Sequence, residues 1–204
     1  MSLSARLRLP VALAAIASVV IAALLAGMAT EGYSQLRHPL GWLGARQLGV
    51  PGTLFGLFAF VLPGLGGAWL ALELRGRLPA AAGWAARIGT QLALLAALGL
   101  AAQGVLPLDL EAVDEGASRL HATAWVLWAL AFPLGALLLA GGLWRMGGWR
   151  RFASLTALAG ILVVAGGFLG SGWIGAAGAQ RVAFAAWLGW GVLAALAPLN
   201  RGAA

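Results

Sequence analysis

The sequence contains no cysteine and no lysine, and charged residues of either sign are rare. Without cysteine there is no disulfide, no thiolate metal site and no cysteine nucleophile. Without lysine, a retinal Schiff base is excluded. Only 9% of the 204 residues are charged and 62% are hydrophobic, whereas soluble domains carry about 25% charged residues. These absences indicate a membrane protein.

Six stretches without Asp, Glu, Lys or Arg are long enough to cross a bilayer, which takes about 20 apolar residues in a helix. From these stretches we predict spans at about residues 10–29, 51–72, 86–106, 121–144, 152–172 and 182–199, of which the third also takes in Arg87 at its start. Strands are not expected, because alternating polar positions are missing and an open sheet would leave backbone groups unpaired in lipid. The sequence therefore predicts an all-α polytopic membrane protein, a compact six-helix bundle forming a single domain over residues 1–204.

The arginines are divided unequally between the two predicted sides of the membrane. With the N-terminus inside, the cytoplasmic set is Arg6, Arg8, Arg75, Arg77, Arg87, Arg145, Arg150, Arg151 and Arg201. The outer set is Arg37, Arg46, Arg119 and Arg181. Nine against four obeys the positive-inside rule, so both termini are expected in the cytoplasm.

The first apolar run and the net charge each have a competing explanation. The run from Leu9 to Met28 is longer than the about 7–15 residues of a signal-peptide core, so we expect it to remain as the first span. The net charge of +7 does not indicate nucleic acid, because the arginines are scattered among hydrophobic spans without a basic arm. The lipid bilayer is the expected partner.

Polar side chains gather in two predicted outer loops, residues 31–44 and 107–121. A carboxylate beside an imidazole orients it and raises its basicity, so Asp109 and His121 are a candidate orienter and base. Ser34 is then the candidate nucleophile of a Ser–His–Asp set, whose order along the chain is unconstrained. In the alternative interpretation, the acidic residues solvate a loop and His121 caps the start of a helix.

Further residues are candidates for holding a ligand or a cofactor. His38, Arg37, Gln103 and Trp125 are the candidate ligand-binding side chains. Trp125 follows His121 by one helical turn and Arg37 suits an anionic headgroup, although packing and snorkelling are the competing roles. His38 with Asp109 and His121 could hold a divalent metal, and the two histidines could ligate haem b. His38 precedes a proline and is expected to be extended, which fits poorly with an axial haem ligand on a helix. The sequence requires no cofactor.

The segments "GYSQLRHPLGWLGA", "FVLPG" and "LPLD", with a histidine at the head of the next span, resemble a bacterial membrane family, domain of unknown function 998. The family pattern maps onto Ser34, His38, Pro39, Gly44, Pro63, Gly64, Pro107, Asp109 and His121. The chain departs from it near Gly41–Trp42, where many relatives have serine or an acid, and at Leu106, where they have an aromatic residue. The resemblance covers most of the chain. It implies a multi-pass protein of the bacterial inner membrane and supplies no activity.

Two functions of different classes follow. The first is a site at the outer leaflet, formed by Ser34, His38, Asp109 and His121, that binds or processes a lipid or small amphiphile. If it is an enzyme, a membrane-embedded hydrolase or transferase is expected. The alternative is a structural or accessory subunit that docks a membrane partner or a second copy, and a haem redox protein is a lesser alternative. The sharpest expectation is that "YSQLRH", residues 33–38, contacts Asp109 or His121.

Overall fold

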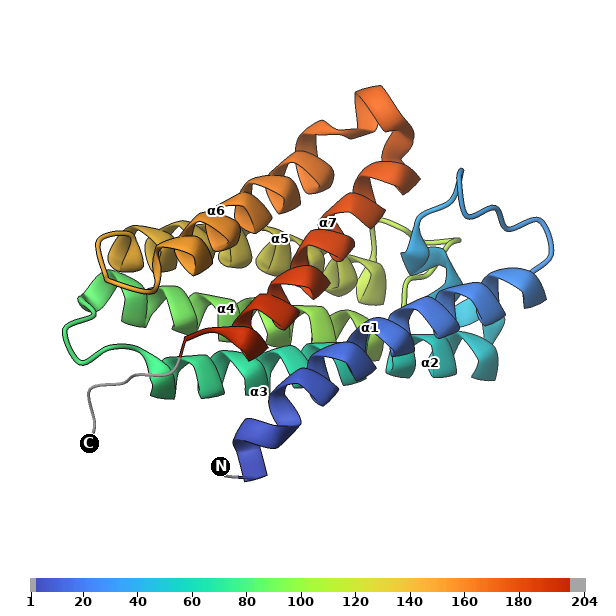
Figure 1. The fold of residues 1–204 in the computed structure, drawn as a ribbon. Helices are drawn as coiled ribbons and strands as arrows, with labels where there is room; N and C mark the ends of the chain where they lie inside the picture. Colours follow the sequence, from blue (N-terminus) through green and yellow to red (C-terminus); the bar gives the residue numbers. More distant parts are fainter. Residues whose placement is uncertain (1–2, 199–204) are drawn as a thin grey trace.

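The computed structural model describes residues 3–198, and this part of the chain forms helices and loops with no strand (Figure 1). The helices are α1 (Leu3–Ala29), α2 (Val50–Gly56), α3 (Leu62–Arg77), α4 (Trp84–Val105), α5 (Gly116–Leu143), α6 (Arg150–Val164) and α7 (Ser171–Leu196). Two short 3₁₀ helices, η1 (Leu40–Gly44) and η2 (Arg46–Leu48), precede α2, and two π-helical segments are η3 (Leu57–Val61) and η4 (Ala165–Leu169). Arg201 and the end of the last predicted span at residue 199 lie outside the described residues.

Because η3 joins α2 to α3 and η4 continues α6, six helices are long and apolar enough to cross a membrane. They are Leu3–Ala29, Val50–Arg77, Trp84–Val105, Gly116–Leu143, Arg150–Leu169 and Ser171–Leu196. This confirms the predicted all-helical class and the six candidate spans.

The last helix begins well before its predicted start at residue 182. It begins at Ser171, is interrupted at Gly175 (φ 72°, ψ 156°), and then continues through Gln180 and Arg181. The predicted start leaves Gln180 and Arg181 outside the span, but in the structure their side chains bind oxygen and nitrogen atoms of residues 33–40. A helix can therefore pass through this position without leaving the charge unpartnered.

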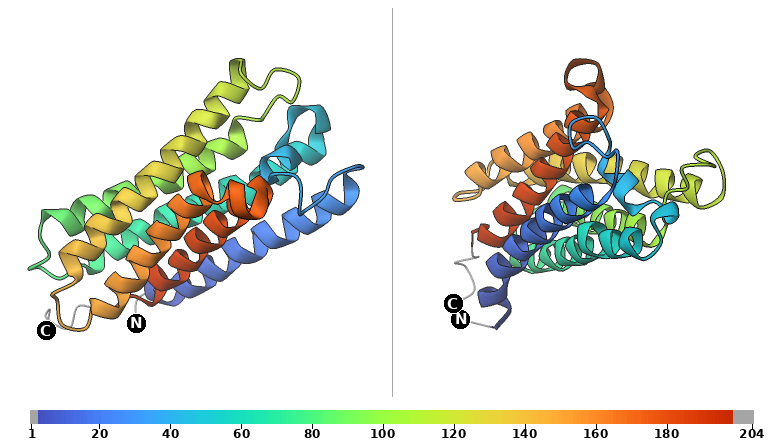
Figure 2. Two further views of the ribbon diagram at one scale, coloured as in Figure 1. Left: turned by 90° about the horizontal axis from the view of Figure 1, so that it is seen from above. Right: turned by 90° about the vertical axis from the view of Figure 1, so that its right-hand side faces the viewer.

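The six spans form a closed ring of neighbours. Along the ring, α1 contacts α3, α3 contacts α4, α4 contacts α5, α5 contacts α6, α6 contacts α7, and α7 returns to α1. Figure 2 shows the first and last helices, blue and red, lying side by side. Residues nearly two hundred positions apart thus share one face of the bundle.

Glycine allows two helices to approach closely at the crossing of α4 and α5. A Cβ atom on Gly89 would lie 2.6 Å from the backbone nitrogen of Leu139, and one on Gly135 would lie 2.8 Å from the carbonyl oxygen of Gly89. Neither position has room for a side chain. Small residues of this kind let membrane helices pack backbone against backbone, which accounts for part of the abundant glycine.

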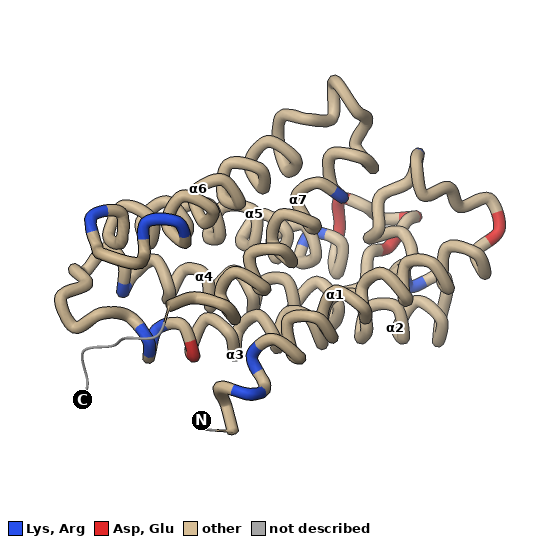
Figure 3. Tube along the Cα trace, in the orientation of Figure 1, with Lys and Arg blue, Asp and Glu red and all other residues tan. Residues whose placement is uncertain are grey.

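The two ends of the bundle differ in charge (Figure 3). We define the arginine end as the start of α1, the connections 78–83 and 144–149, and the end of α7. The loop end is opposite and carries residues 30–49 and 106–115. The described arginines at the arginine end are Arg6, Arg8, Arg75, Arg77, Arg87, Arg145, Arg150 and Arg151.

Arg77 is the most buried of the charged side chains at the arginine end, with 7% of its surface exposed. Its guanidinium donates hydrogen bonds to the carbonyl oxygens of Ala194 and of Ala197, the second at 2.9 Å. Those carbonyls lie at or beyond the end of α7 and lack partners within the helix. Arg77 therefore caps α7, while Glu73, one turn earlier on α3, forms an ion pair with Arg8 at 2.8 Å.

Candidate functional site

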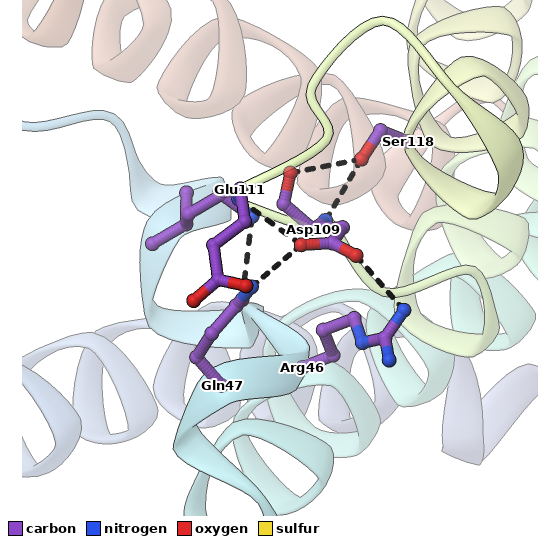
Figure 4. A network of polar contacts seen from close by, with 6 residues as sticks. Arg46, Gln47, Asp109, Glu111 and Ser118 are labelled. Carbon is purple, nitrogen blue, oxygen red and sulfur yellow. Dashed lines mark hydrogen bonds and ion pairs between the residues drawn. The ribbon is translucent and has the colours of Figure 1, made fainter.

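Asp109 joins the two loops of the loop end (Figure 4). Its Oδ2 accepts a hydrogen bond from Arg46 Nη1 at 2.8 Å, and its Oδ1 accepts from Gln47 Nε2 at 2.6 Å and from the backbone N–H of Glu111 at 3.0 Å. Its own backbone N–H donates to Ser118 Oγ at 2.8 Å. Asp109 therefore binds Arg46 and Gln47, which follow the predicted first loop, and among the described residues the expected hydrogen bond or ion pair from residues 33–38 is not formed.

This network explains the electrostatics of Asp109. The hydrogen bond from Gln47 and then that from the Glu111 backbone hold the pKa of Asp109 below its ordinary value. Desolvation opposes them less strongly, and the nearby Arg46 charge lowers the pKa by a still smaller amount. The carboxylate is thus ionised at neutral pH and is already occupied by donors. The arrangement is that of a latch between loops, with Arg46 largely exposed on its outer side (63% of the side chain).

His121 has a different orienting partner from the one predicted. Its Nδ1 lies 2.8 Å from the carbonyl oxygen of Leu106. A carbonyl only accepts, so the neutral ring carries its proton on Nδ1 and leaves Nε2 as an acceptor. Nε2 faces Gly41, where a Cβ atom would stand 3.5 Å away, and the ring packs edge-on against Phe60. His121 is therefore fixed by a backbone carbonyl between the two loops.

Ser34 and His38 form a local pair. The backbone N–H of Ser34 donates to His38 Nδ1 at 3.0 Å, and the imidazole stacks on Trp42 with ring centroids 4.6 Å apart. Across residues 3–198, no hydrogen bond, ion pair or ring contact links Ser34 or His38 to Asp109 or His121.

The structure does not bring the two histidines together with other potential metal ligands among the described residues. In the part of the chain that the structure describes, no three His, Asp or Glu side chains gather as metal ligands would. His38, Asp109 and His121 instead have the separate partners given above. The predicted nucleophile, base, orienter and metal ligands thus occupy the same end of the bundle without forming one cluster.

The remaining predicted ligand-binding residues differ in exposure. Arg37 is exposed in the first loop, and Gln103 is buried, with 3% of its surface accessible. Trp125 is half-buried, with its ring centroid 5.0 Å from that of Trp128 and 5.7 Å from that of Phe184. Its contacts are those of a side chain in the bundle interior, which favours the packing role.

Arg181 is the residue that holds residues 33–38 in place. From α7, its Nη2 donates to Tyr33 Oη at 3.0 Å and to Gln35 Oε1 at 2.7 Å. Its Nη1 donates to the carbonyl oxygens of His38 at 3.2 Å and of Ala177 at 3.0 Å. The segment 33–38 therefore folds onto the α1–α7 side of the bundle.

Two neighbouring contacts complete this attachment. The backbone N–H of Leu40 donates to Gln180 Oε1 at 2.7 Å, and Gln35 Nε2 donates to the carbonyl oxygen of Ala23 on α1 at 2.6 Å. Gln35 consequently bridges α1 to Arg181 on α7. The first loop closes the space between these two helices at the loop end.

Below this closure lies a groove of about 220 Å³ between α1 and α7. Its walls are apolar, with Val20 and Leu24 from α1 and Phe184 and Leu188 from α7. Among the described residues that line it, Gln35 and Arg181 are the polar ones. We call this space the α1–α7 groove. The groove has apolar walls and a cationic group at one end.

Sequence reasoning missed Arg181, Tyr33 and Gln35 as a functional group. One signal was present: Gln180 and Arg181 are the only strongly polar residues between Ser171 and Asn200. A polar pair isolated in an apolar helix usually faces the interior of a bundle and marks a functional site. Its partners in the first loop could not be predicted, because nothing in the sequence indicates that the first span contacts the last.

Comparison with protein-family models, curated proteins and solved structures found no match. The resemblance to domain of unknown function 998 therefore stays a prediction.

Proposed function

We propose that this chain is a multi-pass protein of the bacterial inner membrane that binds a lipid or small amphiphile in the α1–α7 groove. The observation that carries the proposal is the placement of Gln35 and Arg181 at the loop end of a groove whose other walls are apolar. A site of this kind matches both parts of an amphiphile, since apolar walls bury a tail and a few polar groups fix its head.

The size and position of the groove favour an acyl chain. Its volume of about 220 Å³ is below the about 300–1,000 Å³ that drug-sized ligands occupy, which suits a segment of one chain. Val20 and Leu24 are 48% and 53% exposed, so this wall also forms part of the bundle's outer surface. A chain can then reach the groove from the surrounding lipid, without passing through the bundle.

Charge supports placing the groove's polar end at the outer leaflet. The arginines concentrate at the opposite end, and the positive-inside rule puts that end in the cytoplasm together with both termini. In this orientation Arg181 lies at the periplasmic side, level with the first loop. Binding is preferred over catalysis, because no hydrogen bond among the described residues joins the candidate nucleophile Ser34 to the candidate base His121, whose Nδ1 binds the Leu106 carbonyl.

Photocrosslinking tests the proposal. The full chain in nanodiscs of neutral phosphatidylcholine is labelled with a fatty acid that carries a diazirine in its tail, and labelled peptides are mapped by mass spectrometry. We expect concentrated labelling in the α1 and α7 segments that line the groove. Ala23→Phe fills the groove and should abolish this labelling, whereas Ala17→Phe, at an exposed position of the same helix, should not.

Uniform labelling of all exposed helix faces, equal in the two variants, would show that the groove is ordinary lipid-facing surface. The structural or accessory role would then be the better explanation of the chain.

A further inference from the structure

We propose that the α1–α7 groove selects amphiphiles with an anionic headgroup, a carboxylate or a phosphate monoester, and that Arg181 recognises this group. The inference rests on the proposed function, because it names the ligand class of the same groove. It follows from how the guanidinium is partnered, from what surrounds it and from where it lies.

Within the part of the chain that the structure describes, every hydrogen bond that Arg181 donates goes to a neutral oxygen. The acceptors are one phenol oxygen, one amide oxygen and two backbone carbonyls. Within residues 3–198, carboxylates pair with arginine only at Arg8–Glu73 and Arg46–Asp109. Since a guanidinium stays protonated in proteins, Arg181 carries a positive charge that no carboxylate of the described residues pairs with.

Tyr33 does not supply the missing negative charge. Burial raises the pKa of the Tyr33 phenol, and the opposing effect of Arg181 is smaller. The phenol therefore stays neutral at pH 7 and serves as an uncharged acceptor. The α7 helix does not compensate either, because Arg181 lies in its N-terminal half and the negative end of the helix dipole is at the other end.

The position of Arg181 makes this unbalanced charge significant. The residue is half-buried and lines an apolar groove, where a charge has less water to stabilise it than at an open surface. In membrane proteins, such ionisable groups usually pair or bind a charged ligand. An anion at the polar end of the groove would supply the counter-charge.

Arg181 also retains a donor for such a ligand. Its four hydrogen bonds use Nη1 and Nη2, and among the described residues none involves Nε. Guanidinium groups bind carboxylates and phosphates through charge-assisted hydrogen bonds, which are about twice as strong as neutral ones. The groove therefore matches an anionic head above an apolar tail.

The test compares ligands with one tail and different heads. Decanoate, decyl phosphate and decanol are each titrated as competitors of the photoreactive fatty acid on wild-type protein in neutral nanodiscs. We expect the two anions to displace the probe at concentrations about tenfold or more below that of decanol, as charged hydrogen bonds predict. Which anion is the better competitor distinguishes a carboxylate ligand from a phosphate ligand, and inorganic phosphate tests whether the head alone suffices.

Arg181→Gln should remove the preference for the anions and leave decanol unchanged, whereas Arg181→Lys should keep part of it. Arg119→Gln is the matched control, because Arg119 is an exposed arginine at the same end of the bundle and should have no effect. Thermal unfolding of each variant verifies that it folds, and the comparison of heads on wild-type protein needs no variant.

The outcomes separate the two proposals. If none of the three competitors displaces the probe, the amphiphile site itself is wrong. If decanol competes as well as decanoate and decyl phosphate, the groove binds amphiphiles and the anion inference is wrong. A preference that persists in Arg181→Gln overturns the role of Arg181.

Discussion

Helix α7 has one arginine in its N-terminal half and meets another at its C-terminal end, and the two arginines have different surroundings. Arg77 comes from α3 and donates to carbonyl oxygens where α7 ends, and Arg181 lies on α7 itself and donates to the first loop. Both bind only neutral oxygens of the described chain. At the C-terminal end, however, the unpaired carbonyls carry a partial negative charge of roughly half an electron.

The difference shows that the hydrogen bonds of an arginine define its position but do not by themselves show whether its charge is compensated. At Arg77 the acceptors are carbonyls at the negative end of the α7 dipole, so they attract the guanidinium charge as well as accept its hydrogen bonds. At Arg181 the acceptors fix the geometry without balancing the charge. The same residue type, similarly bonded, caps a helix in one place and leaves a cationic site in the other.

Removing the cap should give the largest effect on stability. Arg77→Ala leaves the last carbonyls of α7 buried without a donor, and a lost charged hydrogen bond costs about 1.5–3 kcal/mol. We expect the free energy of unfolding to fall by roughly 3 kcal/mol, measured by denaturant unfolding in detergent. Arg75→Ala, which removes one hydrogen bond to the Arg87 carbonyl at 3.2 Å, is the control and should cost clearly less. Equal losses would contradict the capping role.

The corresponding change at Arg181 should have a smaller effect. Arg181→Met removes hydrogen bonds but also an unbalanced half-buried charge, and these two contributions oppose each other. We expect the free energy of unfolding to change by about 1 kcal/mol or less. Amide hydrogen exchange should accelerate in residues 33–40 and stay slow along α7. A loss as large as that of Arg77→Ala would mean that Arg181 is a structural anchor.

The single tyrosine of the chain gives a direct measure of the field at Arg181. Burial raises the pKa of Tyr33, and Arg181 offsets part of this effect. Spectrophotometric titration of the phenolate should therefore show a pKa above 10 in the wild type and a still higher pKa in Arg181→Met. Because the folded pKa is raised, the contribution of Tyr33 to stability is present below the unfolded pKa of about 10 and is lost at higher pH. An unchanged titration would place Tyr33 away from the guanidinium.

The latch at Asp109 should give the smallest effect. Its pKa is lowered, so its contribution is present above the unfolded pKa of about 3.9 and is lost as the pH falls through the folded value. Hydrogen exchange in residues 106–115 should be constant from neutral pH to about pH 4, after correction for intrinsic rates, and then rise. Asp109→Asn should show the faster exchange already at neutral pH, with residues 33–38 unaffected. Loosening of both segments together would mean that they form one unit.

The fold was largely predictable, because the length of an apolar run and the width of a bilayer set nearly the same limits. Six apolar runs predicted six helices, and the structure has six helices long and apolar enough to cross a membrane. The start of α7 was not predictable in this way. A charged residue normally ends a span, and Arg181 does not, since the first loop provides acceptors that the local sequence does not contain.

The site was less predictable, for a related reason. Asp109 and His121 are neighbours along one loop, which suggested that one orients the other. The carbonyl of Leu106 is closer to His121, and Arg46 and Gln47 are closer to Asp109. Short-range sequence patterns do not show which of several competing partners a polar group finds. The contact between the first loop and the last helix depends on the closure of the ring, which no local pattern encodes.

That closure sets an order of events during synthesis. Arg77 is made 120 residues before Ala197, whose carbonyl it binds, so at about 5–20 residues per second it spends roughly 6–24 s without that partner. The α1–α7 groove likewise has one wall from the first helix and one from the last. It comes into existence only when the whole chain has been inserted, so occupancy of the groove would report that assembly of the bundle is finished.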